Sequence, residues 1–397
     1  MCGILMCVGR RSLAAAALLG AAWFHSSATA ADELLVSDRA TDRILAFDPV
    51  SGAFVRVVSA SPLLDSPSGL TMGPGGFVYV ANSQTDVLKI DPVTGAATVF
   101  ATGIDGPGGI AYNSQDDTLY VSELGQFNGN EVFQYNASGT LVNTIGTLSA
   151  PTGRSGMIVQ NNELYVSSFG LVVAGEVLKH NGAGGLNQFA SGINPGGPTL
   201  MGPSGLEFDA EGDLYVAGLI GQSVLKYPVT AGAVSGPASQ FGGNVPYPAG
   251  LLMQGGPGDE TLLITSLGND NENDPIYGNF TFPGAIYRFD QTTGAAINFL
   301  VGDFDRDLVV DGDDLSVWEA SSGVNGNADA DGDGDSDGND FLLWQRGVGN
   351  QGVLGAFQPT GIVLYSPGVA GAGSVPEPAT LLLVATASGA ALLRRRR

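Results

Sequence analysis

The sequence predicts a mainly β protein, a six-bladed β-propeller that carries a small α-helical module of two loop–helix units. Two observations carry this prediction: a strand pattern that recurs six times at intervals of 41 to 50 residues, and two acidic stretches with the same spacing of aspartates. The 60 glycines and 21 prolines favour many tight turns between short strands. With 44% hydrophobic and 14% charged residues, the 397-residue chain has enough apolar side chains for a large core.

Each repeat contains a short apolar strand core. The six cores are Leu34 to Val36, Val78 to Val80, Leu119 to Val121, Leu164 to Val166, Leu214 to Val216 and Leu262 to Ile264. A second strand follows each core, as in RILAFDPVSG and DVLKIDPVTG, and its alternating apolar and polar residues predict a half-buried strand that ends in a hairpin turn. A third element, of which PSGLTMGPGG is an example, precedes cores two to six.

Repeats of this length are typical of propeller blades, because one blade cannot bury both of its faces whereas a closed ring buries them all. The motifs resemble those of NHL-type and SMP-30/lactonase-like six-bladed propellers over residues 32–301, and a pair of β-sandwiches is the alternative. The first core lacks a preceding strand, and the segment Gln358 to Gly368 has the matching signature. We therefore expect residues 350–374 to contain a strand that completes the first blade, with a flexible spacer as the alternative.

The two acidic stretches, DFDRDLVVDGDD and DADGDGDSDGND, match positions 1, 3, 5, 9 and 12 of a twelve-residue calcium loop, in which position 7 adds a backbone carbonyl. Ca²⁺ takes six to eight oxygen ligands, so alternate residues of a tight loop converge on the ion and the ion offsets their repulsion. A solvated acidic linker is the alternative. The predicted ligands of two Ca²⁺ sites are Asp303, Asp305, Asp307, Val309, Asp311 and Asp314 in the first loop, and Asp329, Asp331, Asp333, Asp335, Asp337 and Asp340 in the second.

A helix start, DLSVW or DFLLW, follows each loop and places an apolar residue and a tryptophan on one helix face. The two units, over residues 302–349, resemble a type I dockerin, which implies calcium-dependent docking to a cohesin-like partner. Leu308 replaces the turn glycine of the first loop and is expected to weaken that site, and Ser336 stands at an apolar position. Cohesin-binding dockerins often carry Ser-Thr at positions 10 and 11, where this chain has Gly312-Asp313 and Gly338-Asn339.

Both ends of the chain resemble processing signals. Residues 1–30 combine paired arginines, an apolar run and small residues at Ala28 and Ala30, the order of a secretory signal peptide; a buried helix is the alternative. Residues 375–397 resemble a PEP-CTERM sorting signal, which an exosortase-type enzyme processes, because an apolar run and four arginines follow Val375, Pro376, Glu377 and Pro378. The resemblance implies transient membrane attachment and delivery to the outer surface or extracellular matrix of a Gram-negative bacterium.

The net charge of the chain and its lack of known catalytic motifs restrict the classes of function that the sequence allows. Loss of the six arginines in the two signals leaves ten basic against 39 acidic residues, a net charge of about −29, which argues against nucleic acid as a partner. Catalytic motifs are absent and His180 is the one histidine outside the signal peptide, so we assign no catalytic residue. We expect a calcium-binding protein of the cell surface or matrix, whose propeller presents a ligand surface toward a polysaccharide or a matrix protein.

The alternative is an enzyme, a hydrolase or lactonase with a divalent metal in the propeller channel. Glu123, Glu163 and Glu207 are its candidate ligands, because each lies near a blade strand. The acidic loop 269–274, NDNEND, is a further calcium candidate or a solvated connection between strands.

Overall fold

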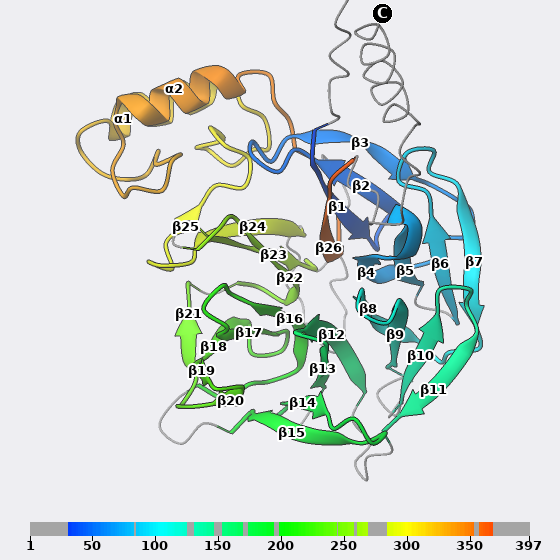
Figure 1. Cartoon of the computed structure of the whole chain (residues 1–397). Helices are drawn as coiled ribbons and strands as arrows, with labels where there is room; N and C mark the ends of the chain where they lie inside the picture. The colour runs from blue at the N-terminus through cyan, green and yellow to red at the C-terminus, as the bar shows by residue number, and fades with distance from the viewer. Residues whose placement is uncertain are drawn as a thin grey trace, which may run out of the picture.

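The computed structural model describes residues 31–82, 85–124, 131–146, 153–169, 174–193, 198–243, 245–257, 260–268, 284–352 and 357–367. Within them, six four-stranded antiparallel sheets form a ring, and two helices lie beside it (Figure 1). The chain is a six-bladed β-propeller, as the repeats predicted. The predicted signal peptide with Ala28 and Ala30, the sorting motif at 375–378 and the loop 269–274 lie outside the described residues. None of the described helices is long and apolar enough to span a membrane.

The blades follow one another along the chain, each with its innermost strand given first. Blade 1 is β26 (Pro359–Tyr365), β1 (Glu33–Asp38), β2 (Arg43–Phe47) and β3 (Phe54–Ser59); blade 2 is β4 (Pro67–Met72), β5 (Val78–Asn82), β6 (Asp86–Ile90) and β7 (Ala97–Thr102), with a 3-10 turn at Pro74–Gly76; blade 3 is β8 (Pro107–Asn113), β9 (Thr118–Glu123), β10 (Val132–Asn136) and β11 (Leu141–Ile145). Blade 4 is β12 (Arg154–Gln160), β13 (Glu163–Ser168), β14 (Glu176–His180) and β15 (Leu186–Ser191); blade 5 is β16 (Pro203–Phe208), β17 (Leu214–Gly218), β18 (Ser223–Tyr227) and β21 (Ser239–Phe241), with a small hairpin of β19 (Val229–Thr230) and β20 (Ala233–Val234); blade 6 is β22 (Pro248–Gln254), β23 (Thr261–Ser266), β24 (Ala285–Asp290) and β25 (Ala296–Ile297).

Blade 1 combines strands from the two ends of the propeller. β26 pairs antiparallel with β1, from Glu33 opposite Tyr365 to Asp38 opposite Pro359. β26 also contacts the innermost strands of both neighbouring blades, β4 and β22. The strand expected after the acidic module therefore lies in the ring and closes it.

The ring is held by apolar clusters between blades. Each of six buried clusters takes its side chains from two neighbouring blades, and the sixth joins blade 6 to blade 1 through Leu263, Ile286, Leu34 and Val36. Burial of apolar surface is the main favourable term in folding, and here it is gained only when blades pack side by side.

Glycines set the close approach of the innermost strands around the channel. These strands repeat one glycine position, and a Cβ atom there would lie 1.9 to 2.7 Å from a carbonyl oxygen of the next blade. No larger residue fits where the backbones meet at that distance. The six residues are Gly69, Gly109, Gly156, Gly205, Gly250 and Gly361.

Hydroxyl groups join each blade to the next at the same level. In blade 4, the Ser167 hydroxyl accepts the Gly156 N–H at 2.7 Å and donates to the Ser204 carbonyl of blade 5 at 2.9 Å. Ser37, Ser122 and Thr265 make the same pair of bonds in blades 1, 3 and 6. Blades 2 and 5 carry Ala81 and Ala217 at this position, and Ser68 and Ser204 of their innermost strands donate to the next blade instead.

Candidate metal-binding module and propeller channel

The loop–helix module, residues 302–349, stands between the last strand of blade 6 and β26 (Figure 1). Its helices, α1 (Gly312–Ser321) and α2 (Gly338–Gly347), each begin at a capping box. The N-cap aspartates are Asp311 and Asp337, and the third helical residues, Asp314 and Asp340, bond back to them. Two carboxylates at each helix N-terminus satisfy backbone N–H groups that would otherwise lack partners.

The two loops have the same hydrogen-bond pattern. The Asp314 carboxylate accepts the N–H groups of Phe304, Asp305 and Asp311 at 2.6, 3.1 and 2.8 Å. Asp340 accepts the corresponding N–H groups of the second loop at 2.6, 3.3 and 2.6 Å, from Ala330, Asp331 and Asp337. The final aspartate of each loop is fully buried and fixes the loop to its helix.

The two units are joined by an exchange of tryptophans. Trp318 of α1 donates its Nε1 hydrogen to the Asp337 carbonyl, and Trp344 of α2 donates to the Asp311 carbonyl, both at 2.8 Å. Each helix thus bonds the end of the other unit's acidic loop. Because each indole donates to a loop carbonyl, we expect tryptophan fluorescence to respond to the order of the loops.

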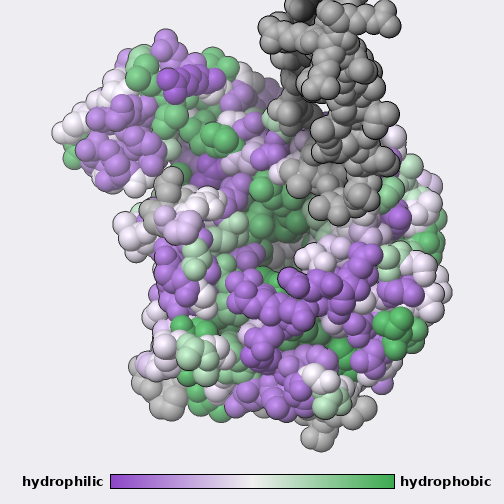
Figure 2. All heavy atoms as spheres, in the orientation of Figure 1, coloured by the Kyte–Doolittle hydropathy of each residue, from purple (hydrophilic) through white to green (hydrophobic). Residues whose placement is uncertain are grey.

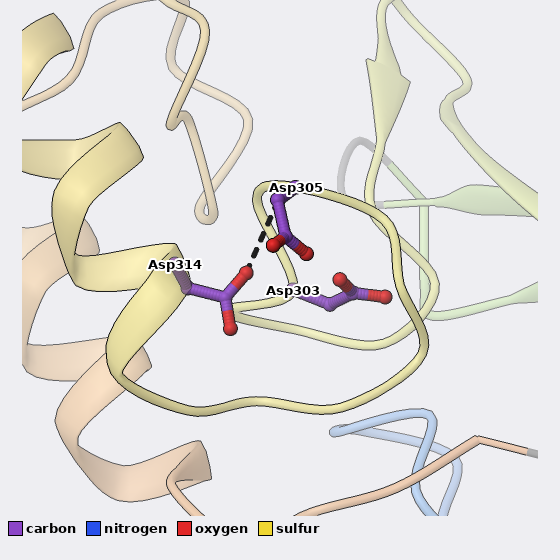
Figure 3. A group of neighbouring side chains, drawn as sticks. All are labelled: Asp303, Asp305 and Asp314. Carbon is purple, nitrogen blue, oxygen red and sulfur yellow. Dashed lines mark hydrogen bonds between the residues drawn. The ribbon is translucent and has the colours of Figure 1, made fainter.

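Three carboxylates of the first loop converge. Oxygen atoms of Asp303, Asp305 and Asp314 lie within 4.8 Å of one another, and Figure 3 shows these side chains on the loop and the first turn of α1. Asp303 and Asp314 are buried. Asp307 and Asp311 are not in this group: they accept backbone bonds from Val309 and Asp313, at 2.8 Å each.

The second loop gathers its aspartates in two groups of oxygens within 4.8 Å. Asp329, Asp331 and Asp333 form one group, and Asp335, Asp337 and Asp340 form the other. The side chain of Asp335, predicted to contribute only its carbonyl, thus joins a carboxylate group. Both loops offer the oxygen donor set that a hard cation such as Ca²⁺ requires, so the residues present fit the predicted ion.

Burial and charge repulsion both disfavour ionised carboxylates in the loops and raise their pKa values. Burial raises the pKa of Asp303 to about 6, and the nearby charges of Asp314 and Asp307 contribute to the rise. The pKa of the exposed Asp335 is raised chiefly by the charge of Asp333. Convergent carboxylates without a cation are therefore destabilised as anions, and a bound cation would offset this cost.

Backbone conformation distinguishes the two loops. Position 6 is left-handed in both, with φ of +72° at Leu308 and +96° at Gly334, and position 4 is left-handed at Arg306 and Gly332. Glycine adopts this conformation freely, whereas Leu308 and Arg306 do so under strain.

The structure also explains why a serine stands at the apolar position 336: its buried hydroxyl accepts the Ala328 N–H at 3.0 Å.

The first loop is attached to the propeller. Asn298 donates to the Asp303 carbonyl at 3.0 Å, and Val309 pairs with Gln351. The Gln351 carbonyl in turn accepts the N–H of Phe54, in β3, at 2.8 Å. Hydrophilic residues cover much of the module's outer face (Figure 2).

The propeller channel contains a cavity of about 260 Å³. Glycines and hydroxyl-bearing residues of the innermost strands line it, together with an apolar group of Leu124, Phe169, Leu219 and Leu267. Arg39 is the one charged residue of this lining among the described residues, and no carboxylate belongs to it. This donor set does not fit a divalent metal, which requires carboxylate or similar oxygen ligands.

The three candidate glutamates do not meet at the cavity. Glu123 ends β9 and accepts the Asp105 N–H at 3.2 Å. Glu163 pairs with Lys179 at 2.7 Å on the face of blade 4 whose Tyr165 packs against blade 5. Glu207 lies in β16, where desolvation raises its pKa to about 7.

No protein-family model and no curated protein sequence matches the chain. Similar solved structures include a PQQ-bound aldose sugar dehydrogenase from Streptomyces coelicolor, with 19% identity, a TM-score of 0.49, and 64% of this chain and 90% of that chain covered. A gluconolactonase from Xanthomonas campestris has 16% identity, a TM-score of 0.44, and coverage of 66% and 82%. Virginiamycin B lyase from Staphylococcus aureus has 16% identity, a TM-score of 0.42, and coverage of 58% and 75%. At these identities the likeness concerns the propeller fold and assigns no activity.

Proposed function

We propose that the loop–helix module is a dockerin-like module that binds two Ca²⁺ ions and thereby fixes a docking surface beside the propeller. One observation carries this proposal: two loops 26 residues apart repeat both the spacing of their aspartates and the hydrogen bonds of their final carboxylate. The ions would neutralise the carboxylates that converge in each loop. Ordered loops would then hold the two helices as a surface for a cohesin-like or matrix partner.

Calorimetric titration with CaCl₂ after chelation tests the proposal. The wild-type protein is expected to bind two ions, and a double variant of either loop to bind one: Asp303→Asn with Asp305→Asn, or Asp329→Asn with Asp331→Asn. Asp32→Asn, an exposed aspartate before β1, is the matched control and should keep both sites. Extracellular calcium modules have dissociation constants of up to about 1 mM. Absence of binding at about 1 mM Ca²⁺ would therefore refute the proposal.

The location belongs to the same proposal and rests on the two terminal signals. A secreted chain processed by an exosortase-type enzyme would present the module and the propeller at the cell surface or in the matrix. Intact-mass measurement of protein recovered from the medium of a host with that enzyme tests this. It should lack both residues 1–30 and the arginine-rich end, whereas a full-length mass would contradict it.

A second candidate function is a hydrolase or lactonase that acts in the channel. Its supporting observation is the mostly apolar cavity with a few convergent polar groups at the centre of the ring, the usual form of a small-molecule site. Assay of the protein against a panel of lactones, with and without EDTA, tests it. Turnover by the wild-type protein that is lost in the Arg39→Ala variant would support this candidate function. Absence of turnover by the folded protein would refute it.

A further inference from the structure

One backbone hydrogen bond recurs at the channel end of five blades. The residue after the second strand donates its N–H to the carbonyl of the residue before the innermost strand, at 2.8 to 3.2 Å. The five donors therefore occupy equivalent places, and all of them line the channel cavity. They are Arg39, Leu124, Phe169, Leu219 and Leu267. The equivalent residue of blade 2, Ser83, lies outside the described residues.

Four of these five residues are apolar, and they belong to the consecutive blades 3 to 6. Phe169 and Leu219 are buried and pack with Tyr247 in a cluster of their own, with Leu267 at its edge. This cluster is separate from the six that join the blades. Blade 4 lies opposite blade 1 in a ring of six, so Phe169 faces Arg39 across the channel. The cavity thus has an apolar side and a cationic side.

Arg39 is a cation without a carboxylate partner in the described part of the chain, where other basic residues form the ion pairs. Its neighbour Asp38 is buried, and that carboxylate accepts bonds from Ala40, Thr41 and Gln358. The Arg39 N–H donates to the Gln358 carbonyl at 3.0 Å, which fixes its backbone beside β26. A free guanidinium offers a fork of N–H donors that matches a carboxylate in two parallel bonds.

Most hydroxyls of the cavity wall already have partners. Ser68, Ser204 and Thr360 donate to carbonyls of the next blade at 3.0, 2.8 and 2.9 Å. Ser155, at the same level of blade 4, makes no such bond to a described residue. Recognition of a polar group in this cavity therefore depends mainly on Arg39.

We propose that the channel cavity binds a small carboxylate with an apolar body. The carboxylate would pair with Arg39, and the body would cover the apolar side around Phe169. The volume of about 260 Å³ is below the range of about 300 to 1,000 Å³ for sites of drug-sized ligands, so the ligand is smaller. The chain carries a net charge of −23 and repels anions in general, so the attraction is local to Arg39.

This inference deepens the second candidate function, because it rests on the channel as a small-molecule site and names the class of ligand. Binding of the carboxylate requires no turnover, so the two can fail separately. Carboxylate binding without turnover of any lactone would support the inference and refute the enzyme. Lactone turnover without carboxylate binding would support the enzyme and refute the inference.

Calorimetric titration of the whole protein with hydrocinnamate tests the proposal against two matched probes. Hydrocinnamyl alcohol keeps the apolar body without the charge, and acetate keeps the carboxylate without the body. Hydrocinnamate should bind with a dissociation constant below about 1 mM, and each matched probe at least about tenfold more weakly. Equal binding of the alcohol or of acetate would overturn the proposal, as would absence of hydrocinnamate binding at about 5 mM.

A first pair of variants tests the cationic side. Arg39→Gln should weaken hydrocinnamate binding at least about tenfold, because it removes a charge-assisted pair, and should leave binding of the alcohol unchanged. Arg43→Gln, at an exposed arginine that begins β2 outside the cavity wall, is the matched control and should bind as the wild type does. Equal affinities of the two variants would refute the role of Arg39.

A second pair tests the apolar side. Leu124→Ala, at a partly exposed residue of the cavity wall, should weaken hydrocinnamate binding about fivefold through lost apolar contact. Leu141→Ala, at an exposed leucine on the outer strand β11 of the same blade, should have no effect. If the two variants bind equally well, the ligand does not lie in the channel.

Discussion

The propeller and the loop–helix module are stabilised by different interactions. Six apolar clusters and close backbone contacts hold the propeller, and neither depends on a cation. The module has one small apolar cluster around Phe304, Ala328 and Ala330, and most of its hydrogen bonds to side chains end on aspartates. The free energy of unfolding of the propeller should therefore depend mainly on packing between blades. That of the module should depend mainly on the charge of its aspartates and on any bound cation.

Gly156→Ala should have the largest effect, a loss of about 3 kcal/mol or more in the free energy of unfolding of the propeller. The new Cβ atom would lie 1.9 Å from the Ser204 carbonyl oxygen, so blades 4 and 5 would have to separate. Urea denaturation followed by tyrosine circular dichroism measures this. Gly256→Ala, at a glycine with open space around it, is the control and should change stability by less than about 0.5 kcal/mol.

Removal of Ca²⁺ should have the next largest effect, confined to the module. If free Ca²⁺ is a hundredfold above the dissociation constant, each site contributes about 2.7 kcal/mol. With EDTA, the tryptophan transition in thermal unfolding should move to lower temperature while the tyrosine transition of the propeller stays in place. Equal shifts of both transitions would show that the two regions unfold as one unit.

The pH dependence of the propeller should follow Glu207. The folded-state pKa of this carboxyl, about 7, lies above its ordinary value, so the folded state binds the proton more tightly. Its contribution is present below pH 4.5 and is lost as the pH rises toward 7. Glu207→Gln should remove this slope and stabilise the propeller at pH 8 by about 2 kcal/mol, allowing for partial solvent screening.

The module should show the same sign of pH dependence without calcium and lose it with calcium. The folded-state pKa of Asp303, about 6, is raised above its ordinary value, so apo-module stability falls between about pH 4 and 6. Bound Ca²⁺ favours the charged form and should reverse this slope. Tryptophan-monitored unfolding across this range, with and without Ca²⁺, measures it, and an unchanged slope on adding Ca²⁺ would contradict a calcium site at Asp303.

The smallest effects should come from the left-handed turns of the two loops. Leu308→Gly should stabilise the module by about 1 kcal/mol, because glycine adopts the positive φ without strain. Gly334→Ala should destabilise it by a similar amount. Tryptophan-monitored urea denaturation compares the two, and changes of the same sign would contradict the strain assigned to Leu308.

The strands that recur in every blade could be predicted from the sequence. The interactions that depend on contacts between blades could not. Six strand cores and the signature at Gln358 were enough for the propeller, because each blade repeats one local pattern. The hydroxyl bonds between blades were not predicted, because Ser167 finds its partner in Ser204 of another blade. The raised pKa of Glu207 was likewise not predicted, because it depends on how deeply this side chain is buried in the folded protein.

The metal loops show the same division. Twelve aspartate and carbonyl positions follow from spacing alone, and their occupancy by Ca²⁺ stays a prediction. The exchange of Trp318 and Trp344 between units, and the attachment of Val309 to Gln351, depend on how the helices pack, which spacing does not encode.

The position of β26 ties completion of the ring to the order of synthesis. β1 is made first among the described strands and β26 last, with every other blade and both acidic loops between them. Until β26 is present, one edge of β1 offers unpaired backbone groups to any other strand it meets. Only a chain translated through the whole module and β26 can cover that edge. A chain interrupted earlier would keep an open ring and an unpaired edge at β1.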